Sequence, residues 1–207
     1  MVSTTRERLD EVAKLSRESP DQVFTEPFLA QAFPTATRIT GPNLVAICDG
    51  SDFRPSGARD CRRLASDDPA LEGLQAACTP EEWEYSGVNL GADEAFGCFA
   101  GEVLAAAGRL HDLRGHVFSV GVLTHPNYRG QGYGTAVASA MTDYGIDAGG
   151  VMYYRALLSN QASVRIARSL GYQEYCTTLF LRLLPSETEQ KDLLRRAGVR
   201  SLNEGVT

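Results

Sequence analysis

The sequence lacks the features that mark a membrane protein or a zinc protein. No apolar segment at its start could serve as a signal peptide, and no run of 18 apolar residues could span a bilayer. Its five cysteines form no Cys-x-x-Cys pair and no Cys/His cluster. We therefore expect no metal and no membrane partner, and a cytoplasmic protein whose thiols are mostly small buried side chains.

Positive charge is also scarce. Twenty Lys and Arg residues against 26 Asp and Glu give a net charge of −6, which argues against nucleic acid or an anionic membrane surface as the main partner. A local basic pocket is compatible with this balance. The length of 207 residues and the 43% hydrophobic content suit one domain with a substantial core, plus an appendage.

A glycine-rich turn between a strand and a helix stands out near the middle of the chain. The apolar, β-branched run 117–124 predicts a strand, and the spacing of apolar residues over 133–144 predicts a helix. Between them, Gly130, Gly132 and Gly134 leave backbone N–H groups uncovered at the positive end of that helix, and Arg129 adds a permanent charge. The pattern predicts a cradle for a pyrophosphate.

Two common phosphate-binding patterns do not fit this turn. The third glycine of G-x-G-x-x-G is replaced by Thr135, and Gly-Lys-Ser/Thr is absent. The run Arg129-Gly130-Gln131-Gly132-Tyr133-Gly134 instead fits Q/R-x-x-G-x-G/A, the acetyl-CoA motif of the GNAT N-acetyltransferase superfamily. A predicted strand at 151–157 follows, and then a segment from Asn160 to Leu170-Gly171-Tyr172 resembles the family's second motif. On both motifs, in this order, the chain is similar to a GNAT acetyltransferase.

The resemblance implies an α/β (α+β) acyl-CoA acyltransferase fold, with a mixed, mostly antiparallel sheet of about seven strands flanked by helices and a helical N-terminal extension. It implies acetyl-CoA as donor, an amine as acceptor and direct transfer in a ternary complex. In the family CoA lies between two splayed parallel strands, here 117–124 and 151–157. The implied cofactor-binding residues are the backbone of Val122, Leu123 and Thr124 for pantetheine and acetyl, Arg129, Gly130, Gln131, Gly132, Tyr133, Gly134 and Thr135 for pyrophosphate, Asn160 and Ser163 for the pantetheine arm, and Arg168 for the nucleotide phosphates.

The sequence departs from the family at both usual catalytic positions. The tyrosine that serves many members as acid for the leaving thiolate corresponds to Ala167, and the usual glutamate base corresponds to Phe118. Tyr154 and Ser119 are the nearest local substitutes. Candidates for a base, acting directly or through water, are Glu82, Glu84 and Asp93.

The expected organisation has three parts. Residues 1–57 form an N-terminal extension of two helices (4–16 and 21–33, the second open to a break at Pro27) and a short strand at 43–48. Residues 58–185 form the acetyltransferase domain, and 186–207 a C-terminal helix and tail. The extension is open to three interpretations: a packed appendage, a homodimer contact or a lid over the acceptor pocket.

The acceptor is not named by the sequence. An acidic stretch, Glu81, Glu82, Glu84, Asp93 and Glu94, surrounds Trp83 and Tyr85. It is either a solvated helix start matched to the helix dipole or an acidic mouth that attracts an amine cation. Two alternatives to a small-molecule N-acetyltransferase stay open: a catalytically inert acyl-CoA-binding module, and an enzyme directed at peptide amines.

Overall fold

The computed structural model describes residues 13–183, except 14, 16, 24, 57–58, 60, 66, 89–93 and 114. The chain forms two compact units: Met1–Gly41 with Leu179–Thr207, and Pro42–Thr178. Most of the helix expected at 4–16 and the whole C-terminal helix lie outside the described residues. The domain boundary expected near residue 57 stays a prediction.

The smaller unit contains two short helices where the sequence suggested one. They are α2 (Pro20–Val23) and α3 (Glu26–Ala32). Thr25 separates them in an extended conformation, with φ −111° and ψ 138°, and caps α3. Pro27 lies in the first turn of α3, where its missing N–H has no intrahelical partner to lose. The proline therefore starts the second helix, and the single helix expected over 21–33 is wrong.

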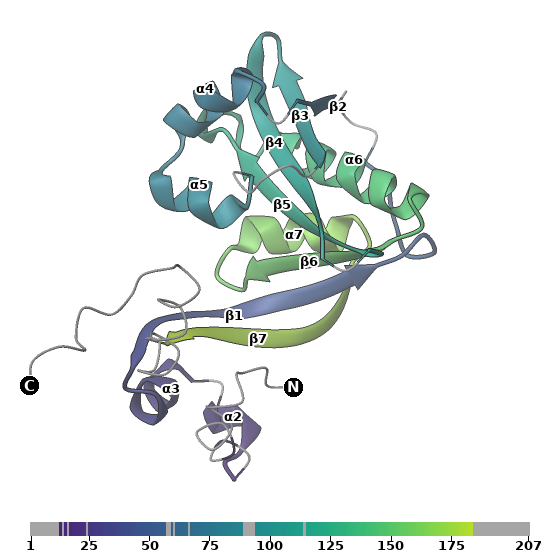
Figure 1. The fold of residues 1–207 in the computed structure, drawn as a ribbon. Helices are drawn as coiled ribbons and strands as arrows, with labels where there is room; N and C mark the ends of the chain where they lie inside the picture. The colour runs from purple at the N-terminus through teal and green to yellow at the C-terminus, as the bar shows by residue number, and fades with distance from the viewer. Residues whose placement is uncertain are drawn as a thin grey trace, which may run out of the picture. The chain divides into compact units, whose positions relative to one another are not determined.

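Seven strands form one sheet in the order β2-β3-β4-β5-β6-β1-β7 (Figure 1). Their bounds are β1 Ala36–Cys48, β2 Cys61–Leu64, β3 Glu94–Ala100, β4 Val103–Asp112, β5 Val117–Thr124, β6 Val151–Leu157 and β7 Gln173–Leu183. Among the strand pairs whose register the described residues establish, only β5 and β6 are parallel. The other pairs are antiparallel: β1–β6, β2–β3, β3–β4 and β4–β5. The expected mixed, mostly antiparallel sheet is confirmed.

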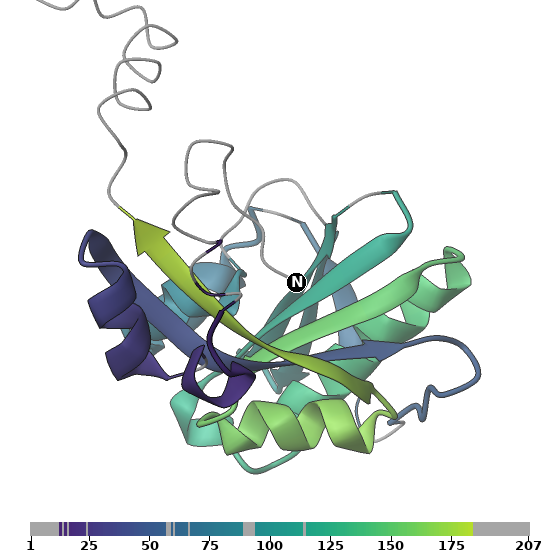
Figure 2. The same cartoon turned by 90° about the horizontal axis from the view of Figure 1, so that it is seen from below.

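The strand expected at 43–48 is longer than the sequence suggested and lies between β6 and β7. It begins at Ala36, and its second half pairs with β6 from Asn43↔Leu157 to Cys48↔Met152. Gly41 has φ 137° within this strand, a backbone conformation that favours glycine, and Pro42 follows it inside the same strand. Figure 2 shows β1 running beside β7, which starts at Gln173 rather than near residue 177.

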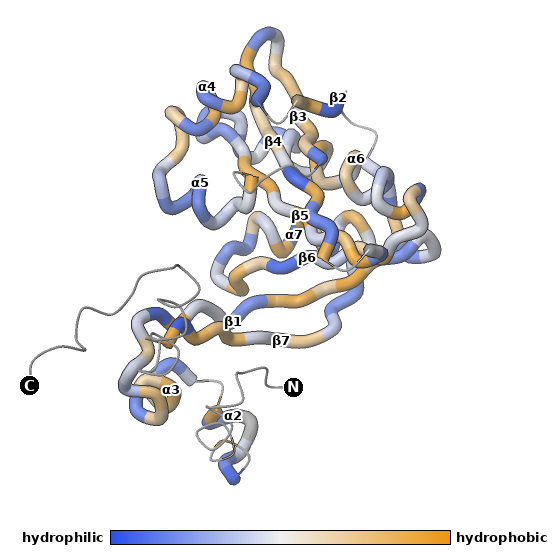
Figure 3. The backbone as a smooth tube through the Cα atoms, in the orientation of Figure 1, coloured by the Kyte–Doolittle hydropathy of each residue, from blue (hydrophilic) through white to orange (hydrophobic). Residues whose placement is uncertain are grey.

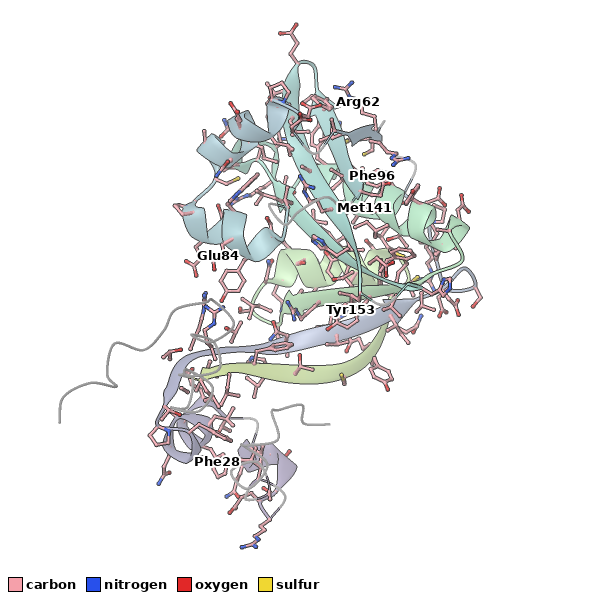
Figure 4. All side chains as sticks on the ribbon, in the orientation of Figure 1. Phe28, Arg62, Glu84, Phe96, Met141 and Tyr153 are labelled. Carbon is pink, nitrogen blue, oxygen red and sulfur yellow. The ribbon has the colours of Figure 1, made fainter. Side chains whose placement is uncertain are left out.

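In the larger unit, helices cover both faces of the sheet (Figure 1). On one face α4 (Ala70–Ala77) and α5 (Pro80–Ser86) cover β4 and β5, and Leu71 and Leu74 pack with Leu104 and Leu123. On the other, α6 (Tyr133–Asp147) and α7 (Gln161–Ser169) bury a second cluster that includes Val120, Met152 and Val164. Figure 3 shows apolar residues along the central strands, and Figure 4 shows Met141 of α6 close to Phe96 of β3. Burial of these apolar side chains holds the sheet between its helices.

Candidate functional site

The parallel strands β5 and β6 part from each other halfway along their length. Their register runs from Val117↔Val151 to Val120↔Tyr154 and goes no further among the described residues. Both strands continue, because Thr124 still pairs with Ala106 of β4 and Leu157 still pairs with Asn43 of β1. The divergence leaves the facing backbone groups of the two strands available to an extended ligand, which can pair with them like an added strand. Val122, Leu123 and Thr124 lie on the diverging part of β5.

The glycine turn follows directly and begins the long helix α6. A 3₁₀ turn, Pro126–Tyr128 (η2), leads to Arg129. Gly130 has φ 74°, and Gly132 has φ 86° and caps α6. A Cβ added at either glycine would meet no protein atom within 4 Å. The turn therefore adopts a backbone conformation that favours glycine and leaves open space beside it. The first N–H groups of α6, from Tyr133, Gly134 and Thr135, lie at the positive end of a 15-residue helix.

Gly134 has a different role from the other two glycines. A Cβ at this position would lie 2.7 Å from Thr124 Oγ1 and 3.4 Å from Ile166 Cδ1. The absence of a side chain lets the start of α6 approach the end of β5 and the helix α7 closely. The three glycines therefore place the helix N-terminus beside the diverging strands.

Arg129 binds protein groups on both sides of the turn. Its Nε donates to Thr124 O at 3.2 Å, and its Nη2 donates to Glu82 Oε1 at 2.8 Å. The guanidinium thus fastens the turn to the end of β5 and to α5. The direct contact between Arg129 and a phosphate stays a prediction.

Glu82 has both carboxylate oxygens occupied. A capping box begins α5, in which Glu82 Oε2 accepts from Thr79 N at 3.1 Å and Thr79 Oγ1 accepts from Glu82 N at 3.2 Å. The hydrogen bond from Thr79 N to the carboxylate, together with the ion pair to Arg129, lowers the pKa of Glu82. A carboxylate held in its charged form by such bonds is a weak proton acceptor, so the geometry argues against Glu82 as general base.

Of the other expected acidic residues, Glu94 lies away from Glu82. Glu84 is exposed on α5 (Figure 4), and Asp93 lies outside the described residues. Glu94 begins β3, forms an ion pair with Arg63 and accepts a 3.5 Å hydrogen bond from Tyr144 of α6. That bond places Glu94 on the α6 face of the sheet, away from α5. An acidic mouth built from all five residues is therefore not what the structure shows.

The C-terminal end of α5 is fixed over β4 and β5 by three contacts that sequence reasoning missed. A Cβ on Gly121 would collide with Ser86 O, so this glycine permits close approach of the helix. His111 Nε2 lies 3.0 Å from Gly87 O, and the buried Arg109 donates to Val88 O. A glycine inside a β-branched strand was the one sequence signal for this approach.

Tyr154, Ser163 and Asn160 come together at the start of α7. The side chain of Tyr154 is almost fully buried, and its hydroxyl lies 3.0 Å from Ser163 Oγ. Burial raises the pKa of Tyr154, so its phenol keeps its proton. Asn160 caps α7 by accepting from Ser163 N at 3.2 Å. The Asn160 Nδ2 has no partner within the described part of the chain, so cap and ligand contact are compatible.

The remaining expected residues lie elsewhere. Arg168 is in the last turn of α7, at the opposite end from Asn160, and forms a 2.6 Å ion pair with Glu174. Ala167 is fully buried, and Phe118 is partly buried and packs against the core. The thiol of Cys48 is buried, which raises its pKa to about 11 and makes it a poor nucleophile.

The described residues contain no group of three or more His, Cys, Asp or Glu side chains that could hold a metal ion. No helix within residues 13–183, apart from the undescribed positions, is long and apolar enough to cross a membrane.

A second arginine reaches the glycine turn from a distant segment. Arg59 lies between β1 and β2, and its Nε and Nη2 donate to Gln131 O at 3.2 and 2.8 Å. Its guanidinium carbon lies 3.8 Å from the centre of the Tyr133 ring. No motif pointed to Arg59, because its partners lie far from it in the sequence.

Diverging parallel strands with a glycine-capped helix beside them define the class of acyl-CoA acyltransferase folds. The Acetyltransferase (GNAT) family model matches residues 60–172, more than half of the 207-residue chain. The chain belongs to the GNAT acetyltransferase family. No curated protein sequence matches it significantly.

Solved structures show the same fold. A GNAT-family protein from Novosphingobium aromaticivorans superimposes with a TM-score of 0.57 at 23% identity, covering 70% of this chain and 65% of that one. A GNAT-family acetyltransferase from Colwellia psychrerythraea gives a TM-score of 0.56 at 16% identity, covering 77% of this chain and 62% of that one. A GCN5-related N-acetyltransferase from Kribbella flavida gives a TM-score of 0.53 at 17% identity, covering 80% of this chain and 65% of that one. The chain spans less than two thirds of each of these proteins, and at these identities the likeness concerns the fold alone.

Proposed function

We propose that the protein transfers the acetyl group of acetyl-CoA directly to an amine in a ternary complex, as an N-acetyltransferase. The observation that carries this proposal is the coincidence of two features: β5 and β6 diverge after Val120 and Tyr154, and the N-terminus of α6 begins beside that divergence. An extended pantetheine arm with a pyrophosphate at one end needs both features at once.

The donor fits the residues that are present. Backbone groups of Val122, Leu123 and Thr124 would pair with the pantetheine arm, and Asn160 Nδ2 would donate to it. The pyrophosphate would lie on the N–H groups of the glycine turn and of the first turn of α6, in the open space beside Gly130 and Gly132. Acetyl-CoA supplies an activated thioester carbonyl, and the protein supplies position and proton transfer.

Tyr154 is the proposed acid for the departing thiolate. As the C–N bond forms and the C–S bond breaks, the sulfur needs a proton, which Tyr154 would supply through Ser163 Oγ. Helical side chains lean toward the helix N-terminus and cover the preceding turn. A tyrosine at 167 would therefore place its hydroxyl over position 163, and the Tyr154 hydroxyl lies beside Ser163. The lost family tyrosine at Ala167 would thus be replaced by a hydroxyl from β6.

The acceptor is proposed to be a small-molecule or peptide amine, and a cationic one is favoured. Glu81 and Glu84 are exposed on α5, and this helix is fixed over β5 on the face of Gly121. Glu84 is the remaining candidate on α5 for a base that acts through water. A cytoplasmic location and the interpretations of residues 1–57, including a homodimer contact, stay part of the hypothesis.

Two measurements test the proposal. Calorimetry should show binding of CoA and acetyl-CoA in preference to ATP or NAD. Thiol release from acetyl-CoA should then depend on an amine from a panel of polyamines, amino acids and peptides. Binding of ATP or NAD without CoA would overturn the proposal. CoA binding without turnover on any amine would favour the inert acyl-CoA-binding module instead.

A further inference from the structure

We propose that Arg59 is a positioning residue that sets the orientation of the peptide between Gln131 and Gly132 and thereby aims the Gly132 N–H at the pyrophosphate. This inference rests on the proposed function of the glycine turn. It concerns a residue from outside both sequence motifs.

The contact between Arg59 and the turn is specific in geometry. Two N–H groups of the guanidinium converge on the single carbonyl oxygen of Gln131, at 3.2 and 2.8 Å. The same group lies over the face of Tyr133, 3.8 Å from the ring centre. A planar guanidinium can donate two hydrogen bonds to one oxygen and stack on an aromatic ring at the same time. An ammonium group cannot make both contacts together.

The aromatic ring beneath this guanidinium is held in place by its packing. The Tyr133 ring is buried with 7% of its surface exposed, and it packs edge-on against Tyr128 at 5.6 Å. On the other side, Ser56, three residues before Arg59, donates a 2.8 Å hydrogen bond from its backbone N to Ser139 Oγ of α6. The aromatic ring under the guanidinium is therefore buried and fixed, while Arg59 itself is exposed.

The peptide bond converts this contact into an effect on the cradle. In a trans peptide the C=O and the following N–H point in opposite directions. Because Gln131 O points at Arg59, the Gly132 N–H points away from it. A glycine at φ 86° has a broad range of accessible conformations, so without Arg59 this peptide can rotate. The cation also polarises the carbonyl, which strengthens the N–H as a donor.

The experiment compares two substitutions at Arg59 with a matched control. Arg59→Gln removes both the positive charge and the paired hydrogen bonds to Gln131 O. Arg59→Lys keeps the positive charge but not the paired hydrogen bonds. Arg62→Gln is the control, since Arg62 also lies over an aromatic ring, that of Phe99 at 4.5 Å, but belongs to β2. Calorimetry measures the Kd of CoA and of 3′-dephospho-CoA, circular dichroism measures the Tm, and NMR measures the backbone order parameter of Gly132 without ligand.

We expect both Arg59 variants to raise the Kd of both ligands about tenfold, the size of losing hydrogen bonds to a charged partner. Tm should stay near that of Arg62→Gln, and the Gly132 order parameter should fall. Wild-type affinity in Arg59→Lys would overturn the inference, because charge alone would then suffice. If the variants lost affinity for CoA but not for 3′-dephospho-CoA, the inference would be overturned too, because that result would indicate a direct contact between Arg59 and the 3′-phosphate.

A failure of the proposed function can be distinguished from a failure of the positioning role of Arg59. If the wild-type protein binds no CoA, the proposed function fails. The Gly132 order parameter still tests the positioning role in that case, and an unchanged value in both Arg59 variants would overturn it. If an Arg59 variant does not fold, the other is measured.

Discussion

Glu82 and Arg129 lie 47 positions apart in the sequence and form a 2.8 Å ion pair that joins α5 to the glycine turn. The same glutamate closes the capping box of α5, and the same arginine holds the end of β5. The helix expected to line the acceptor site is therefore fastened to the turn expected to hold the donor. Changes at one position should be felt at the other.

The first prediction separates this link from catalysis. Glu82→Gln keeps the capping box, because glutamine serves that role as well, but removes the charge opposite Arg129. We expect CoA affinity to fall by a few-fold, as for a partly exposed ion pair, with kcat at saturating substrate nearly unchanged. A fall in kcat of about a hundredfold, the size typical of losing a general base, would contradict this assignment.

The same variant carries a pH prediction. The folded-state pKa of Glu82 is lowered from 4.5 by its hydrogen bonds to Thr79 and by Arg129. A lowered carboxyl pKa stabilises the folded state above the ordinary pKa, and this contribution disappears as pH falls through the folded value. The difference in Tm between wild type and Glu82→Gln should therefore be constant at neutral pH and shrink below about pH 4.5. A difference that grows on acidification would contradict it.

The second prediction concerns the glycine turn. Gly132→Ala places a side chain in the open space beside the turn at φ 86°, and the left-handed backbone costs about 1–2 kcal/mol of stability. Gly149→Ala is a matched control, because Gly149 has φ 78°, also has open space, and lies beyond the other end of α6. The Tm should fall by a similar amount in both variants. Calorimetry should show a loss of CoA binding in Gly132→Ala only. Equal CoA affinities in the two would place the phosphate elsewhere.

The third prediction divides the two roles of Asn160. Asn160→Ala removes the cap and should cost about 1 kcal/mol of stability. Asn160→Asp keeps an oxygen that accepts from Ser163 N but lacks the Nδ2 donor. Both variants should weaken CoA binding by the equivalent of about 1 kcal/mol, a lost hydrogen bond. Wild-type affinity in the aspartate variant would show that Asn160 only caps the helix.

The fourth prediction tests the proposed acid. Tyr154 and Tyr172 pack together at a ring distance of 5.2 Å, and each has one hydroxyl partner, Ser163 and Thr142 respectively. Either change to Phe should cost about 1 kcal/mol of stability. Only Tyr154→Phe should lower kcat, by about a hundredfold, and it should change the alkaline limb of the pH–rate profile. Equal kcat values in the two variants would remove Tyr154 from the mechanism.

Local patterns predicted the centre of the molecule well. The strands at 117–124 and 151–157 and the helix that follows Gly132 were predicted from residues close together in the chain. The contacts that decide roles were not visible in this way. Whether the Glu82 carboxylate is free depends on Arg129, and the orientation of Gln131 depends on Arg59, which lies 72 positions away. Pairing between distant segments also decided the place of β1 between β6 and β7, which no local pattern predicted.

The divergence of β5 and β6 has a consequence for the smallest piece of this chain that can fold. Beyond Tyr154 the strand β6 has left β5, and its residues Arg155, Ala156 and Leu157 pair with Val45, Leu44 and Asn43 of β1. Those partners precede the region matched by the family model, which begins at residue 60. A chain shortened to 60–172 would give this part of β6 an unpaired edge and would remove β7 as well, leaving backbone groups exposed to aggregation. Autonomous folding should therefore require the segment from residue 42 onward.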